Sequence, residues 1–128
     1  MTTLAKDQTG TWDYDKVPEA AVTMPLAYGY MRVPADAPDS KVLGTERAMR
    51  IYAAKLGYYL IEIFYEFHCG SQETFNELVH ELQRADAHAV VVPSYRHFAR
   101  SVLLQNNFVA KLEFDAQAKV FELRGADV

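Results

Sequence analysis

Basic side chains near the ends of two apolar segments carry the clearest chemistry in this sequence. Arg32 lies inside an otherwise apolar run, where a charge is costly unless its guanidinium group reaches a partner or solvent. A guanidinium group presents a planar fork of N–H donors that matches the oxygens of phosphate or carboxylate. The candidate residues for such a small-anion site are Arg32, Arg96, His97 and Arg100. The alternative for Arg32 is an internal ion pair, for which the available carboxylates are Asp36, Asp39 and Glu66.

Three hydroxyl or thiol side chains could act as nucleophiles, but none stands out. Ser71 precedes a helical pattern and is better explained as a helix cap, and Ser94 could cap a short helix that starts near Tyr95. Cys69 lies beside His68, but neighbours in an extended loop usually point apart, and a small buried cysteine is the commoner outcome. A small-molecule enzyme with Cys69 or Ser94 as its nucleophile is therefore a minor hypothesis.

The sequence contains no recognisable metal or cofactor motif. Neither of the two Gly-rich phosphate-binding patterns, G-x-x-x-x-G-K-[ST] and G-x-G-x-x-G, occurs anywhere. The four histidines, at positions 68, 80, 88 and 97, lack metal-ligand spacing, and a single cysteine cannot build a structural zinc site. We therefore predict no cofactor and no metal.

The composition fits one folded domain in a reducing compartment. The 128 residues are half apolar and 12% aromatic, which suffices for one packed core. The formal charge of −4 has the wrong sign for a protein whose whole surface binds DNA, although local basic patches remain open. Because the chain has one cysteine, no signal-peptide pattern at its start and no long apolar run, we expect a cytoplasmic protein that does not enter a membrane.

Alternating apolar and amphipathic segments predict a β-α-β-α-β-α-β order. The strands are expected at residues 26–33, 59–66 and 89–92, with a last strand marked by Val120 and Leu123, with Phe121 opposite. Helices are expected at residues 42–56 and 101–114, with another between them that Ser71 caps.

Periodicity also predicts which side chains of each element face the core. In the second strand, one side should hold Tyr59, Ile61, Ile63 and Tyr65, and the other, solvent-facing side should hold Glu62 and Glu66. The apolar faces of the three helices should hold Ala48, Ile51, Tyr52 and Leu56, then Phe75, Leu78, Val79 and Leu82, then Leu104, Phe108 and Leu112. Gly57 should end the first helix. An exposed apolar patch on the aromatic-rich second strand would indicate a homodimer.

Strands that alternate with helices predict a mostly parallel sheet covered on both faces by helices. In such sheets, ligands bind beyond the carboxyl ends of the strands. Three loops should therefore form any site, namely residues 32–40, 67–71 and 93–100. They hold all four residues of the predicted anion site.

Three segments resemble the catalytic domain of resolvase and invertase serine recombinases. The run from Tyr28 to Val33 is similar to the family's Y-x-R-V-S opening strand. The run from Phe67 to Ser71, followed by Phe75 to Leu78, resembles its S-G-S turn and R-P-x-F-x-E-L helix start. The run from Val91 to Arg100 is similar to V-x-P-S-L-D-R-L-A-R. The resemblance implies a three-layer resolvase-like α/β domain with a four-stranded sheet in the order 2-1-3-4.

The sequence departs from the family at the positions that carry its chemistry. Members form a phosphoserine link to DNA, but Pro34 stands where the resemblance puts the attacking serine. Gln72 stands in place of an arginine, Arg96 in place of the aspartate, and His97 in place of a second arginine, whereas Arg100 is kept. The comparison therefore implies a degenerate recombinase domain that is not an enzyme.

The resemblance also sets the expected domain organisation and function. We expect a flexible arm at 1–25, the resolvase-like domain at 26–124, a tail at 125–128 and no helix-turn-helix domain. The leading hypothesis is a protein-interaction or regulatory module that binds a small anion at the former active site. Its partner would be an unidentified protein or a second copy of the chain. The alternative is an accessory DNA-binding protein that contacts phosphates through the predicted anion site.

Overall fold

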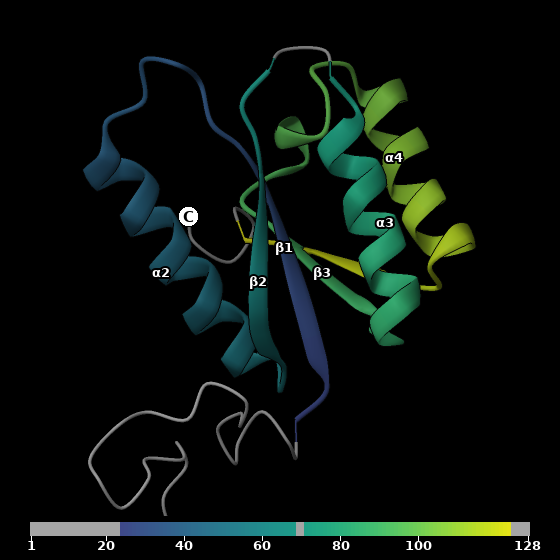
Figure 1. Ribbon diagram of the computed structural model, residues 1–128. Coiled ribbons are helices and arrows are strands. Elements are labelled where there is room, and N and C mark those ends of the chain that lie inside the picture. Colours follow the sequence, from purple (N-terminus) through teal and green to yellow (C-terminus); the bar gives the residue numbers. More distant parts are fainter. Residues whose placement is uncertain (1–23, 69–70, 124–128) are drawn as a thin grey trace, which may run out of the picture.

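A four-stranded parallel sheet forms the centre of the molecule (Figure 1). This computed structural model describes residues 24–68 and 71–123. The elements in chain order are β1 (Leu26–Arg32), α2 (Asp39–Lys55), β2 (Tyr59–Glu66), α3 (Glu73–Ala85), β3 (Ala89–Val92), the 3-10 helix η1 (Tyr95–His97), α4 (Val102–Asp115) and β4 (Lys119–Glu122). The strand order is β2-β1-β3-β4, and all neighbours pair in parallel. The expected α/β class and the expected sheet order are therefore confirmed.

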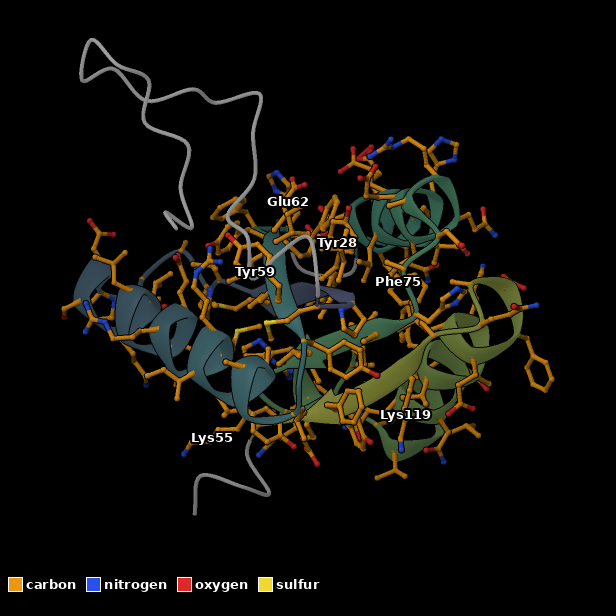
Figure 2. All side chains as sticks on the ribbon, turned by 90° about the horizontal axis from the view of Figure 1, so that it is seen from below. Tyr28, Lys55, Tyr59, Glu62, Phe75 and Lys119 are labelled. Atoms are coloured by element: carbon orange, nitrogen blue, oxygen red, sulfur yellow. The ribbon has the colours of Figure 1, made fainter. Side chains whose placement is uncertain are left out.

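Helices cover both faces of the sheet and make three layers. α2 lies on one face, and α3 and α4 lie on the other (Figure 1). Figure 2 shows Tyr28 and Phe75 on the side of α3 and α4, while Lys55, at the end of α2, lies on the opposite side. Successive strand residues point to opposite faces, so the central strands supply two separate cores. The core under α3 and α4 includes Tyr28, Tyr30, Val90 and Val92, and the core under α2 includes Ala27, Met31, Ala89 and Val91.

The side pattern expected for β2 is partly wrong because the strand contains an extra residue. Leu60 pairs with Ala27 but Glu62 pairs with Tyr28, so Ile61 has no partner on β1. Such a bulge reverses the alternation, and Leu60 therefore joins the α2 core with Ile63, while Ile61 is 38% exposed. The Arg50 guanidinium group donates a hydrogen bond to the Leu60 carbonyl beside the bulge (2.9 Å).

A second correction concerns Glu66, which was expected to face solvent. Glu66 does lie on the side opposite Ile63 and Tyr65, but it is only 1% exposed. Its carboxylate accepts hydrogen bonds from the His68 amide and from the hydroxyl groups of Thr74 and Ser71.

The aromatic rings in and next to β2 are partly buried: Phe64 packs against the core under α3 and α4, Tyr58 and Tyr65 pack against the core under α2, and Tyr59 is half-buried. The expected homodimer stays a prediction.

The first helix begins earlier than expected, and its expected core face is partly correct, since Ala48 and Tyr52 pack against the core under α2. α2 starts at Asp39 with Pro38 at its N-cap, and it buries Met49 and Ala53, whereas Ile51 is 51% exposed. The small side chain of Ala53 and the flexible side chain of Met49 fit a helix that lies close to the sheet. The sequence prediction did not place them in the core because it was based on the spacing of larger apolar residues. Leu56 is also exposed.

The expected end of α2 at Gly57 is confirmed by its geometry. Gly57 has a φ of 91°, a conformation that favours glycine. Its N–H bonds to the Ala54 carbonyl and the Tyr58 N–H bonds to the Ala53 carbonyl, which is the Schellman arrangement.

The expected faces of α3 and the strand β3 agree with the structure. All four predicted apolar residues of α3 are buried, and so is every residue of β3. In α4, Leu112 is buried and Phe108 is partly buried, but Leu104 is 49% exposed, which corrects its placement in the core. Val120 faces α3 and α4 with Phe121 on the opposite side, as expected, but Leu123 lies on the same side as Phe121, which corrects its expected placement.

The expected N-terminal arm and C-terminal tail lie mostly outside the described residues and stay predictions. Within the described ranges, no helix combines the length and apolarity that crossing a bilayer requires.

Gly29 is needed where α2 approaches the sheet. A Cβ atom at this position would lie 2.9 Å from both Ile63 Cγ1 and Met49 Cε, whereas a Cβ atom at Gly44, inside α2, would meet nothing within 4 Å. We expect Gly29→Ala to lower the free energy of unfolding by about 1–3 kcal/mol through overpacking. Gly44→Ala should raise it by about 0.5–1 kcal/mol, because alanine loses less backbone entropy in a helix. Urea denaturation of both variants checks this pair, and a neutral or stabilising Gly29→Ala would contradict the packing described here.

Candidate functional site

Arg32 joins the carboxyl end of β1 to two neighbouring loops. Its backbone N–H donates to His97 Nδ1 (3.0 Å). Its guanidinium group donates through Nε to the His97 carbonyl (3.2 Å), through Nη1 to the His68 carbonyl (3.1 Å) and through Nη2 to the Phe98 carbonyl (3.4 Å). Three of the five guanidinium N–H groups are thus bound to main-chain oxygens, and two remain for a ligand. We call this set of four hydrogen bonds the Arg32 clip.

The alternative ion pair of Arg32 is not formed with the three candidate carboxylates. In the described part of the chain, none of the carboxylates of Asp36, Asp39 and Glu66 lies within ion-pair distance of the Arg32 guanidinium group. Carbonyl oxygens take the place of a carboxylate because β1 ends where the loops after β2 and β3 pass over it.

His97 lies beside Arg32 and is neutral near neutral pH. Burial, and to a smaller extent the nearby positive charge of Arg32, lower the pKa of its imidazole to about 4. Its Nδ1 accepts the Arg32 amide proton, so near neutral pH the imidazole carries its proton on Nε2. The side chain therefore contributes a hydrogen-bond donor, and no positive charge, to the predicted anion site.

Glu66 provides a buried negative charge next to Arg32. The two residues pair across β1 and β2. Burial alone would raise the pKa of Glu66, but a hydrogen bond from the His68 amide (2.8 Å), the hydroxyl groups of Thr74 and Ser71, and the charge of Arg32 together lower it. This carboxylate offsets part of the field of Arg32 toward any bound anion.

A cavity of about 750 Å³ opens on the side of α3 and α4, and we call it the aromatic cavity. Phe98 and Phe108 line it, with ring centroids 5.9 Å apart, and Phe67 and Leu104 line it as well. Its polar lining consists of Arg32, Ser71, Gln72, Arg96, Arg100 and Ser101. Both Arg96 and Arg100 are exposed, so their charges face the cavity and solvent together.

A second cavity of about 550 Å³ lies on the side of α2. It shares Arg32, Pro34 and Arg96 with the aromatic cavity and adds His97 and Lys41. The structure thus gathers the four predicted anion-site residues at one end of the sheet, as the loop argument predicts. Lys41 was missed because the pattern places it in a loop before the helix, whereas it belongs to the first turn of α2.

The candidate nucleophiles have structural roles or lie outside the described residues. Ser71 Oγ accepts a hydrogen bond from the Glu73 N–H (3.2 Å), which confirms its part in starting α3, although Gln72 holds the N-cap position. Ser94 is 8% exposed and holds the N-cap position of η1, but its side chain makes no capping bond. Cys69 lies outside the described residues. Within residues 24–68 and 71–123, no group of three or more His, Cys, Asp or Glu side chains is placed to hold a metal ion.

The neutral state of His97 predicts a pH dependence of stability. Since its pKa is about 4 in the folded protein and about 6.5 when unfolded, the unfolded chain binds more protons between these values. This contribution is complete above pH 6.5 and is lost as the pH falls toward 4, by up to about 3 kcal/mol. Urea denaturation at pH 7.5 and 4.5 measures it. The control is His97→Asn, whose amide oxygen can still accept from Arg32 without titrating, and equal losses in both proteins would rule out the assigned role.

Comparisons with known proteins agree at the level of fold. No protein-family model and no curated protein matches the sequence. The structure is similar to the C-terminal catalytic domain of ISC1926 TnpA, an IS607-like serine recombinase, with a TM-score of 0.65 and 15% identity over 80% of this chain and 69% of that one. It is also similar to the N-terminal catalytic domain of TP901-1 integrase, with a TM-score of 0.57 and 16% identity over 77% of each chain. The chain therefore has the fold of serine recombinase catalytic domains.

Proposed function

We propose that this chain is a non-catalytic resolvase-like domain of the cytoplasm, a protein-interaction or regulatory module that binds a small anion at the former active site. The observation that carries the proposal is the identity of the residue two positions after the first strand. Pro34 lines both cavities at the position that the sequence resemblance gives to the attacking serine. A proline side chain has no hydroxyl group, so it cannot form a covalent link to phosphate.

The surroundings of Pro34 support the same proposal. Transfer of a phosphoryl group requires several donors directed at its oxygens. The Arg32 guanidinium group directs three of its donors at carbonyl oxygens instead, and His97 is neutral. Gln72, at the position of an arginine in the resemblance, carries no charge.

The remaining cationic groups support binding of an anion rather than its conversion. Arg96 and Arg100 are exposed, line the aromatic cavity and make no ion pair with a described residue. Arg32 adds its two unused donors, and His97 adds a neutral one. An anion at this edge of the sheet would thus pair mainly with Arg96 and Arg100.

An accessory DNA-binding role is the alternative function. The exposed Arg96, Arg100 and Lys41 favour it, because they lie around neighbouring cavities at one end of an otherwise acidic molecule. Phosphate contacts of this kind would be independent of base sequence and sensitive to salt.

Incubation with supercoiled DNA tests the loss of catalysis and separates the two functions. We expect no cleavage and no serine-linked protein–DNA adduct on denaturing gels, with TP901-1 integrase as the positive control for the assay. An adduct would overturn the proposal. On native gels, a DNA complex that weakens steeply with salt and is lost in Arg96→Glu would establish the alternative instead.

Titration with inorganic phosphate at low salt tests the anion site. We expect calorimetry to detect binding to the wild-type chain and a loss of about tenfold in affinity in Arg96→Gln and in Arg100→Gln, because each removes a charge-assisted hydrogen bond. Arg47→Gln, on the exposed face of α2, is the matched control and should bind phosphate normally. Undiminished binding in both test variants would refute the assigned residues.

A further inference from the structure

One end of α4 carries an aromatic side chain with no cover from the described part of the chain. Phe114 is 82% exposed, more than any other large apolar side chain in the described residues. Glu113 and Asp115 on either side of it are exposed as well. The C-terminal end of a helix is also the negative end of its dipole, which adds to these two carboxylates, while the exposed Lys111 one turn earlier offsets part of their charge.

This end of α4 is held in place. The Asp115 carbonyl accepts a hydrogen bond from Gln83 Nε2 of α3 (2.7 Å), and Leu112, one turn earlier, is completely buried. An exposed aromatic side chain on a fixed backbone loses little conformational entropy when it binds.

The other end of α4 borders a cavity with complementary properties. The aromatic cavity is walled by Phe98 and Phe108 and rimmed by Phe67 and Leu104, which are 62% and 49% exposed. Arg96 and Arg100 add two positive charges to this apolar lining. An aromatic ring flanked by two carboxylates therefore matches it in both polarity and charge.

A single copy cannot bring the two ends together. Leu104 and Phe114 are ten residues apart on one straight helix, a separation of about 15 Å. Any contact between Phe114 and the aromatic cavity must therefore join two copies. Because the two surfaces differ, the contact is heterologous, and it can repeat from copy to copy.

We propose that this chain associates head to tail with itself: Phe114 of one copy inserts into the aromatic cavity of the next, and Glu113 and Asp115 pair with Arg96 and Arg100. The inference rests on the proposed function, since the bound anion is here a carboxylate of a second copy. A contact of one side chain and its neighbours is small, so the assembly is weak and reversible.

Sedimentation velocity over a concentration series tests the proposal. The wild-type chain should exceed the dimer mass as its concentration rises. Phe114→Ser and the double variant Arg96→Glu/Arg100→Glu should each weaken association by more than about tenfold, since a buried aromatic or arginine anchor carries most of a small interface. Ile51→Ser and Arg47→Glu, at exposed positions of α2, are the matched controls and should associate as the wild type does.

Mixing the two deficient variants gives the sharpest result. Phe114→Ser keeps an intact cavity and the double arginine variant keeps an intact Phe114, so an equimolar mixture can form one contact and should stop at the dimer. A wild-type chain that stays monomeric, an association that survives Phe114→Ser, or a mixture that forms no dimer would each overturn the proposal. Phosphate titration of Phe114→Ser distinguishes failure of the self-association from failure of the anion site. If this variant binds phosphate and the wild-type chain is monomeric, the anion site is supported and only the self-association is refuted.

Discussion

The Arg32 clip is the interaction on which this end of the molecule depends. β1 is central in the sheet, and its last residue is tied by one side chain and one amide to the loops that follow β2 and β3. A buried or half-buried guanidinium group must find acceptors, and main-chain carbonyls satisfy it without a second charge. Arg32 also lines both cavities, and its positive charge adds to burial in keeping His97 neutral. The position of one arginine thus links the loops of the site and contributes to its electrostatics.

Sequence patterns predict the framework well where side-chain size and spacing carry the information. The four apolar residues of α3 repeat at regular helical spacing, and β3 is a short β-branched run, so both elements could be predicted directly. The sheet order came from the resemblance rather than from periodicity. The bulge at Ile61 could not be predicted, because one unpaired residue leaves no mark on an apolar strand.

The site was predictable in location but not in the role of each residue. Strand ends of a parallel sheet meet at one edge, which correctly gathers Arg32, Arg96, His97 and Arg100. The sequence cannot show that the Arg32 guanidinium group donates hydrogen bonds to three carbonyl oxygens of distant loops, because every residue has a carbonyl group. It also cannot show that His97 is neutral, because its pKa depends on burial and on the nearby charge of Arg32. The division of the four residues into two that hold the structure and two that face solvent appears only in three dimensions.

Residue-resolved NMR of the arginine side chains tests this division most directly. In a titration with inorganic phosphate, the account predicts that the Nε–H signals of Arg96 and Arg100 shift with the ligand. The Arg32 Nε–H signal should barely move and should exchange slowly with solvent, because its proton is bound to the His97 carbonyl. An Arg32 signal that exchanges rapidly and shifts most of the three would contradict the account, since Arg32 would then be an anion ligand and not a structural clip.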